Sequence, residues 1–195
     1  MKKILKSTLI LCLITLIAGL ALAVVYEVTK APIALSQEKA RQKAYAAVFS
    51  SATTFEETEV QEATTSPNVL VERVVLAKDG DRLLGYVLMM TSKNGYGGDI
   101  KLAMGVTPDG TLTGISIVSQ SETAGLGAKC KDKSFVSQFA GITAGVVEVT
   151  KQDPTAPNQI QAISGATITT TAVAEAVNTG LAYVRDVYFD RSGEA

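Results

Sequence analysis

The chain opens with a long apolar run. MKKILKSTLILCLITLIAGLALAVVYEVTK stands at the N-terminus, and no charged residue occurs from Thr8 to Tyr26. As a helix, this run would reach ~28 Å, close to the thickness of the hydrocarbon core of a bilayer. The pattern therefore predicts one transmembrane helix.

The residues that flank the run predict its orientation. Lys2, Lys3 and Lys6 precede it, so the positive-inside rule keeps the N-terminus cytoplasmic and places the rest of the chain outside. A cleaved signal peptide is the alternative, since residues 21–23 form a small-x-small site. We favour a retained helix, because the apolar run continues through Val24 and Val25.

After the anchor the pattern becomes amphipathic. Apolar residues recur at helical spacing between Pro32 and Phe49, which predicts a second helix that leads into a folded domain. The expected apolar face of this helix consists of Ile33, Ala40, Ala44, Ala47 and Val48. Residues 50–67 are polar and acidic, and they predict a loop or a weak strand.

From residue 68 the pattern is typical of strands and turns. Apolar, β-branched runs flank Lys78-Asp79-Gly80 and again flank residues 107–110, which predicts two hairpins. Residues 146–150 are a further candidate strand, and residues 169–189 have the period of a helix. The predicted fold class is α+β, with a mostly antiparallel sheet and helices packed against one face. The predicted regions are 1–28 (N-terminus and transmembrane helix), 29–67 (helical connection and polar segment) and 68–195 (extracytoplasmic domain).

Composition narrows the chemistry that this chain can perform. A formal net charge of -1 without a long basic run argues against nucleic-acid binding. Because the chain has no His, a Ser-His-Asp triad, a CxxCH haem site and a His-bearing zinc site are excluded. Its two Cys cannot supply the four thiolates of an iron–sulfur cluster. We expect no metal site, and redox chemistry here would need an organic cofactor.

The two cysteines are not expected to form a disulfide. Cys12 lies within the predicted membrane helix, whereas Cys130 belongs to the exported domain. We therefore expect Cys130 to be a small buried residue, with a free reactive thiol as the alternative.

Three loops rich in glycine and small residues interrupt the domain. They are NGYGGDI (94–100), SETAGLGAK (121–129) and SGATITT (164–170). Glycine permits positive φ and a close approach of the backbone to a ligand, so the loops are candidates for one shared site. Ordinary turns are the alternative for each loop taken alone.

The hydroxyl groups of SGATITT stand where the C-terminal helix is expected to begin. A helix needs one N-cap hydroxyl, yet four threonines are present: Thr167, Thr169, Thr170 and Thr171. The N-terminus of a helix also attracts phosphate through its free N–H groups and partial positive charge. The residues alone therefore indicate either a helix cap or a phosphate-bearing ligand near 164–170.

Several motifs together resemble a known family. SGAT at 164–167 resembles the flavinylation motif of FMN-binding domains, whose Thr is joined to FMN by a phosphoester that a dedicated flavin transferase makes. GYGG at 95–98, ETAGLG at 122–127 and TKAPI at 29–33 resemble the G subunit of the Rnf complex. That complex is the ion-translocating ferredoxin:NAD oxidoreductase. The resemblance covers nearly the whole chain.

The resemblance implies a covalent FMN on Thr167 and assigns roles to other residues by position. The approach to the phosphate would be formed by Ser164, Gly165 and Ala166, and Thr170 is a candidate to bond the phosphate. The residues expected to line the ribityl chain or the isoalloxazine ring are Glu122, Thr123, Leu126 and Gly127, with Lys129 close by and Tyr96 and Gly97 as further candidates. A turn with a core-facing Tyr is the alternative for the last two.

Three positions depart from the family's pattern. Gln161 stands where the family often has Asp, three residues before the Ser of the motif. Gln120 and Ala124 replace the His and Pro of the loop that commonly reads HxETPGLG. The first change bears on the efficiency of flavin attachment, and the loss of Pro bears on the rigidity of the loop.

The implied function is electron transfer within a membrane complex. The chain would be part of an ion-translocating oxidoreductase, would hold no complete active site and no catalytic residue of its own, and would pass electrons between partners. The implied partners are the other Rnf subunits, a flavin transferase and membrane lipid. The alternatives are the C subunit of the sodium-pumping NADH:quinone oxidoreductase, another membrane-anchored flavin module, and a scaffold without cofactor.

Overall fold

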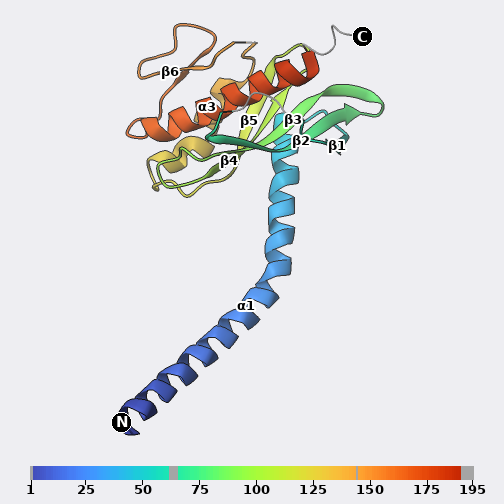
Figure 1. Ribbon diagram of the computed structural model, residues 1–195. Helices are drawn as coiled ribbons and strands as arrows, with labels where there is room; N and C mark the ends of the chain where they lie inside the picture. Colours follow the sequence, from blue (N-terminus) through green and yellow to red (C-terminus); the bar gives the residue numbers. More distant parts are fainter. Residues whose placement is uncertain (1, 62–65, 144, 190–195) are drawn as a thin grey trace. The chain divides into compact units, whose positions relative to one another are not determined.

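A computed structural model describes residues 2–61, 66–143 and 145–189 of the chain (Figure 1). The chain divides into two compact units, Met1–Ala40 and Arg41–Ala195. Helix α1 (Lys2–Val48) continues without interruption through Pro32, and its last residues, from Arg41 on, belong to the second unit. The predicted start of a second helix at Pro32 is therefore wrong. Proline removes one backbone hydrogen bond from a helix, and the bonds of the neighbouring turns keep this helix continuous.

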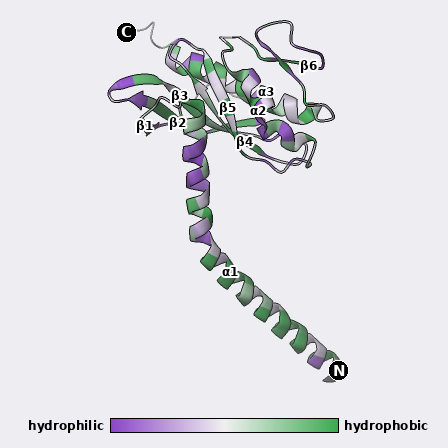
Figure 2. Ribbon diagram, turned by 180° about the vertical axis from the view of Figure 1, so that it is seen from behind, coloured by the Kyte–Doolittle hydropathy of each residue, from purple (hydrophilic) through white to green (hydrophobic). Residues whose placement is uncertain are grey.

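Helix α1 has the properties that a membrane anchor requires. Within the described part of the chain, it is the helix long and apolar enough to cross a membrane, and none of its apolar stretch is buried inside the protein. Figure 2 shows hydrophobic residues dominating its N-terminal half and hydrophilic residues appearing toward its C-terminal half. This polarity agrees with a span over residues 8–26 followed by an amphipathic portion.

The second unit is built on a five-stranded antiparallel sheet whose strands follow chain order. Its strands are β1 (Thr54–Thr58), β2 (Val69–Asp79), β3 (Arg82–Ser92), β4 (Ile100–Val106) and β5 (Leu112–Ser119). Both predicted hairpins are confirmed, since β2 pairs with β3 and β4 pairs with β5. Strand β1 is the weak strand that the polar segment 50–67 allowed, and residues 62–65 of that segment lie outside the described residues.

The remaining elements follow the sheet. They are the short helices η1 (Gly127–Lys131), α2 (Lys133–Val136) and η2 (Ser137–Phe139), strands β6 (Glu148–Thr150) and β7 (Gln159–Gln161), helix α3 (Thr167–Val184) and the π-helical turn η3 (Arg185–Phe189). The predicted strand at 146–150 is confirmed in shortened form as β6, which pairs in parallel with β7. The sequence did not predict β7, because three residues with polar ends carry no strand pattern. The predicted C-terminal helix is confirmed and begins earlier, at Thr167.

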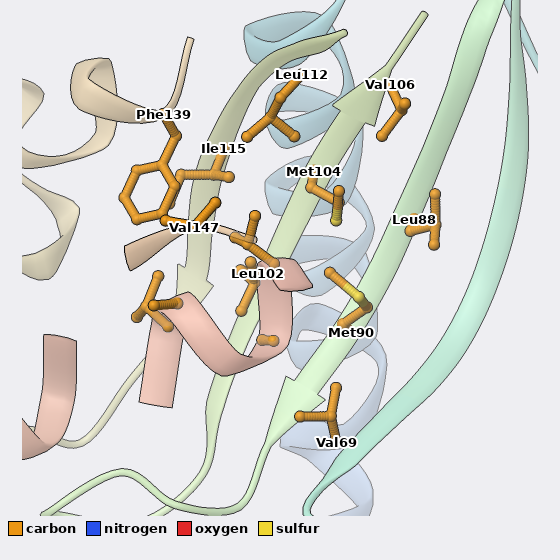
Figure 3. Close-up of a cluster of buried hydrophobic side chains, with 14 of the residues drawn as sticks. Val69, Leu88, Met90, Leu102, Met104, Val106, Leu112, Ile115, Phe139 and Val147 are labelled. Atoms are coloured by element: carbon orange, nitrogen blue, oxygen red, sulfur yellow. The ribbon is translucent and has the colours of Figure 1, made fainter. Parts of the chain in front are cut away.

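The main core lies between one face of the sheet and helix α3. Figure 3 shows Leu88 and Met90 of β3 beside Leu102 and Met104 of β4 in this cluster, and all four are fully buried. Burial of each such side chain contributes roughly 1.5–3 kcal/mol. On α3, the predicted positions Val173, Val177 and Val184 face this core and Leu181 packs at its edge, as does Tyr188 of η3.

A second cluster covers the opposite face of the sheet. The last turn of α1 and the residue that follows it bring Tyr45, Val48 and Phe49 against Val87 and Met89 of β3. Helices therefore cover both faces of the sheet. The predicted α+β class with an antiparallel sheet and packed helices is confirmed, and only the restriction of the helices to one face is wrong. The uninterrupted apolar run of β3 agrees with this, since a strand buried on both faces needs no alternation.

The contact face of this helical segment differs from the predicted one. Ala44 and Val48 are buried as expected, whereas Ile33 and Ala47 are exposed and Ala40 is half-buried. Tyr45 and Phe49 take the buried places instead. Large aromatic side chains bury more area than alanine, and they therefore decide which face of the helix turns to the sheet.

Phe49 packs against the sheet where two neighbouring strands have glycine. A Cβ added to Gly85 would lie 2.6 Å from the Phe49 ring, and one added to Gly105 would lie 2.9 Å from it. The glycines of β3 and β4 thus leave the space that the ring fills, and only 6% of Phe49 is exposed.

Cys130 is the small buried residue that the sequence predicted. It lies in η1, is fully buried in the main core, and is a free thiol. Burial raises the pKa of Cys130 to about 11, and the negative charge of nearby Glu122 adds to the effect. The thiol is therefore a poor nucleophile at neutral pH.

Replacing Phe49 by Ala tests the second cluster. We expect F49A to lower the free energy of unfolding by about 3–5 kcal/mol, because it removes a buried ring and leaves a cavity over Gly85 and Gly105. F55A is the matched control, since Phe55 is only partly buried at the edge of the same cluster, and it should cost roughly 1–2 kcal/mol. Urea unfolding of the detergent-solubilised chain measures both, and equal losses would contradict the assignment.

The raised pKa of Cys130 predicts an alkaline loss of stability. The folded state retains the thiol proton up to about pH 11, whereas the unfolded chain releases it near its ordinary value of 9.0. Above pH 9 the unfolded state thus binds fewer protons, so stability falls as the pH rises. The stability difference between wild type and C130A should narrow by on the order of 2 kcal/mol between pH 9 and pH 11. A constant difference in denaturant titrations across this range would refute the prediction.

Candidate functional site

The three glycine-rich loops converge on one buried carboxylate. Only 8% of Glu122 is exposed. Its Oε1 accepts a hydrogen bond from the backbone N–H of Gly97 at 2.9 Å, and its Oε2 accepts one from the Thr169 hydroxyl at 2.6 Å. Glu122 therefore joins the loop at 94–100, its own loop and the first turn of α3.

Glycine is needed where these segments meet. A Cβ added to Gly127 would lie 2.5 Å from Glu122 Oε2 and 2.6 Å from Thr169 Oγ1. A Cβ added to Gly97 would lie 2.2 Å from the carbonyl oxygen of Ser121. Real side chains do not approach so closely, so these two glycines allow the loops to pack around the carboxylate.

A cavity of about 500 Å³ opens beside this junction. Its size falls within the range of small-molecule sites, about 300–1,000 Å³. The cavity is lined by Tyr96, Glu122, Thr123, Leu126, Gly127, Gly165, Ala166, Thr167, Ile168 and Thr169. All three loops thus contribute to one cavity, which favours the shared site over three unrelated turns.

Two lining residues, Ile168 and Thr169, were not among the sequence candidates. Both directly follow the SGAT motif, and they reach the cavity because α3 begins at Thr167 and turns its first residues toward it. Thr169 could have been recognised as one of the surplus hydroxyls of SGATITT. Ile168 is 56% exposed. It could have been recognised in the sequence as an apolar residue that directly follows the SGAT motif.

Other sequence candidates lie outside the cavity lining. Lys129 and Ser164 line a separate, polar pocket of about 230 Å³. Gly97 acts through its amide, which donates to Glu122. Thr170 is fully buried, and its hydroxyl donates to the carbonyl of Ala166 and accepts from the N–H of Ile163. Its hydroxyl is thus engaged by the protein itself.

The helix-cap explanation of the SGATITT hydroxyls does not hold. The N-cap residue of α3 is Ala166, and no side-chain cap hydrogen bond forms at this end of the helix among the residues that the structure describes. Alanine is a poor N-cap residue, so the first N–H groups of α3 keep their capacity to bind an anion. This end of α3 borders the cavity through Ala166 and Thr167.

The four threonines have separate places. Thr167 lines the cavity and its side chain is exposed. Thr169 is buried and bonded to Glu122, and Thr170 is bonded to the backbone around it. Thr171 is exposed and does not line the cavity. Thr167 is therefore the hydroxyl of this set that is both accessible and in the cavity.

The turn before α3 depends on a glycine. Gly165 has φ +75°, a conformation that favours glycine, and a Cβ there would lie 3.0 Å from Leu126 Cδ2. Leu126 thus packs closely over the turn that presents Thr167. This geometry accounts for the glycine of the SGAT motif.

The departures from the family pattern have local partners. The side chain of Gln120 accepts a hydrogen bond from the N–H of Glu122 at 2.5 Å. The side-chain amide of Gln161 donates to Asp153 at 3.1 Å, and its backbone N–H donates to Gln138. Gln161 also lines the polar pocket with Ser164.

The residues of the cavity suit a flavin nucleotide better than a metal. The uncapped helix end and the small residues of the turn offer room and N–H groups for a phosphate. Three large apolar side chains at the cavity, Tyr96, Leu126 and Ile168, are exposed and available to a flat ring. Within the described residues, no group of three His, Cys, Asp or Glu side chains could hold a metal ion.

Two family models match the chain. The RnfG N-terminal region matches residues 1–48, and the FMN-binding domain matches residues 95–182. The second match contains the complete cavity lining.

Two solved structures share the fold. The NqrC protein of Shewanella oneidensis covers 75% of this chain and 74% of its own, with a TM-score of 0.55 and 19% identity. The C subunit of the Na(+)-translocating NADH-quinone reductase of Parabacteroides distasonis covers 69% of this chain and 77% of its own, with a TM-score of 0.53 and 22% identity.

Relatives in sequence belong to membrane complexes. The G subunit of the proton-translocating ferredoxin:NAD(+) oxidoreductase complex of Clostridium ljungdahlii is 46% identical, over 52% of this chain and 54% of its own length. The G subunit of the Na(+)-translocating ferredoxin:NAD(+) oxidoreductase complex of Acetobacterium woodii is 33% identical, over 91% of this chain and 89% of its own length. The G subunit of the ion-translocating oxidoreductase complex of Methanosarcina acetivorans is 30% identical over 94% and 95%. The chain therefore belongs to the family of G subunits of the ion-translocating (Rnf) oxidoreductase complexes and contains its FMN-binding domain.

Proposed function

We propose that this chain is an electron-carrier subunit of a membrane-bound ferredoxin:NAD oxidoreductase complex that translocates ions, and that its FMN is joined to Thr167 through a phosphoester. One observation carries the proposal: the exposed hydroxyl of Thr167 stands in the cavity, at the uncapped end of α3, inside the FMN-binding match. The other subunits of the complex would be its redox partners.

The residues around Thr167 fit such an attachment. The N–H groups at the start of α3 would receive the phosphate oxygens, and Gly165 and Ala166 would let the phosphate approach without a side-chain clash. Tyr96, Leu126 and Ile168 would contact the ring, and Thr123 also lines the cavity.

When bound, FMN accepts and releases electrons, and the protein supplies attachment, orientation and electrostatics. The ester to Thr167 would prevent loss of the cofactor outside the cytoplasm. Lys129 and Ser164 border the neighbouring polar pocket, where the flavin transferase would have access to the motif.

The anchor would hold the domain at the membrane. We infer that α1 crosses the bilayer once, that the N-terminal lysines stay cytoplasmic, and that the FMN-binding domain lies on the outer side. Lipid would surround the exposed apolar stretch of the helix.

The C subunit of the sodium-translocating NADH-quinone reductase is the second candidate, and its fold likeness favours it. The G subunit of the Rnf complex is the better-supported assignment, because relatives of that name cover more than nine-tenths of this chain. A scaffold without cofactor would leave the cavity and the exposed Thr167 unexplained.

Mass spectrometry tests the attachment. Protein made together with a flavin transferase should carry an added mass of roughly 438 Da, FMN less one water, on the peptide that contains Thr167. T167A should lose all covalent flavin fluorescence in a denaturing gel and keep the fold. T171A is the matched control, because Thr171 is an exposed threonine of the same helix outside the cavity, and it should keep the fluorescence. Fluorescence retained in T167A would rule out the assigned residue.

Fusions test the membrane arrangement. Alkaline phosphatase fused to the C-terminus should be active, since it folds only outside the cytoplasm. A fluorescent protein fused at the same place and exported by the same route should not fluoresce. The intact mass should include residues 1–23, which a signal peptidase acting after Ala23 would remove. A soluble product lacking those residues would contradict the retained helix.

A further inference from the structure

Glu122 is the carboxylate in the wall of the cavity. Among the described residues that line it, the other ionisable side chain is Tyr96, which is 70% exposed at the rim, whereas Glu122 is 8% exposed. A charge in so buried a place is weakly screened by water, and its field therefore reaches any group in the cavity.

The surroundings of Glu122 stabilise its charge without neutralising it. Both oxygens accept hydrogen bonds, from Gly97 N–H and from the Thr169 hydroxyl. Within the described part of the chain, Glu122 forms no ion pair. Its two partners are electrically neutral groups, so the negative charge is not cancelled where it stands.

The charge already acts on a neighbour. Burial raises the pKa of Cys130 to about 11, and the charge of Glu122 contributes in the same direction by opposing a second negative charge nearby. Adding electrons to a flavin in the cavity would likewise bring negative charge toward Glu122.

We propose that the buried Glu122 carboxylate lowers the reduction potential of the flavin, because its uncompensated charge opposes the addition of electrons in the cavity. The inference rests on the proposed attachment of FMN to Thr167. It makes Glu122 a residue that sets the driving force of electron transfer, in addition to its part in joining the loops.

Substitution by glutamine separates the charge from the structure. In E122Q, the amide oxygen can still accept from Gly97 N–H, and the amide nitrogen can donate to the Thr169 hydroxyl, which is able to accept as well as donate. Shape and both hydrogen bonds are kept, while the charge is removed.

Glu175 provides a matched control. Its carboxylate also accepts two hydrogen bonds from neutral groups, at 2.8 Å from the Ser66 hydroxyl and at 2.8 Å from the Asn94 amide. It lies on α3 but not in the cavity lining. E175Q therefore removes an equal charge with similar contacts at a place away from the flavin.

The experiment is a spectroelectrochemical titration of covalently flavinylated full-length protein in detergent, in which an electrode and soluble mediators supply the electrons. E122Q should raise the midpoint potential, with roughly a tenfold larger ratio of reduced to oxidised flavin at a fixed potential, about 30 mV for a two-electron couple. E175Q should change this ratio much less. Thermal unfolding of the unflavinylated proteins, compared before loading, should show that E122Q keeps its fold.

T169V keeps the proposal testable if E122Q does not fold. Valine replaces the buried hydroxyl but leaves the charge of Glu122 in place, so the potential should not rise. A rise in T169V or an unchanged potential in E122Q would overturn the proposal. If the wild-type protein carries no flavin on Thr167, the proposed attachment itself is refuted. The mass of the wild-type protein is therefore measured before the titration.

Discussion

The site depends on two hydrogen bonds to one buried carboxylate. The contacts of Glu122 to Gly97 and Thr169 join the loop at 94–100 to the first turn of α3 beside the cavity. Burying a carboxylate is costly unless its oxygens find donors, and here two segments distant in sequence supply them. The hydrogen bonds that stabilise the charge of Glu122 therefore also hold the segments around the cavity together.

The glycines of the domain serve packing as much as backbone conformation. Gly97 and Gly127 let the loops close on Glu122, and Gly85 and Gly105 make room for Phe49 on the other face of the sheet. Each pair removes side-chain volume where a functional or anchoring group needs it. The absence of a side chain thus serves both the cavity and the contact between the end of α1 and the sheet.

Much of the fold and part of the site could be predicted from the sequence. The hairpins and the C-terminal helix follow from local periodicity and turn residues, and Thr167 follows from its motif. The parallel pair β6 and β7 and the burial of Tyr45 and Phe49 depend on tertiary contacts, which leave no period in so short a stretch. The different hydrogen bonds of Thr169 and Thr170 could not be predicted from SGATITT, because the folded structure determines that Glu122 and Ile163 are their partners.

The junction of anchor and domain has a practical consequence. The compact unit that contains the sheet begins at Arg41, within α1 and before the first strand. A water-soluble fragment cut at the end of the hydrophobic stretch must keep the residues from Arg41 to Phe49. A fragment starting at β1 would strip the second face of the sheet and leave Val87, Met89 and Ala103 open to water, where they would promote aggregation.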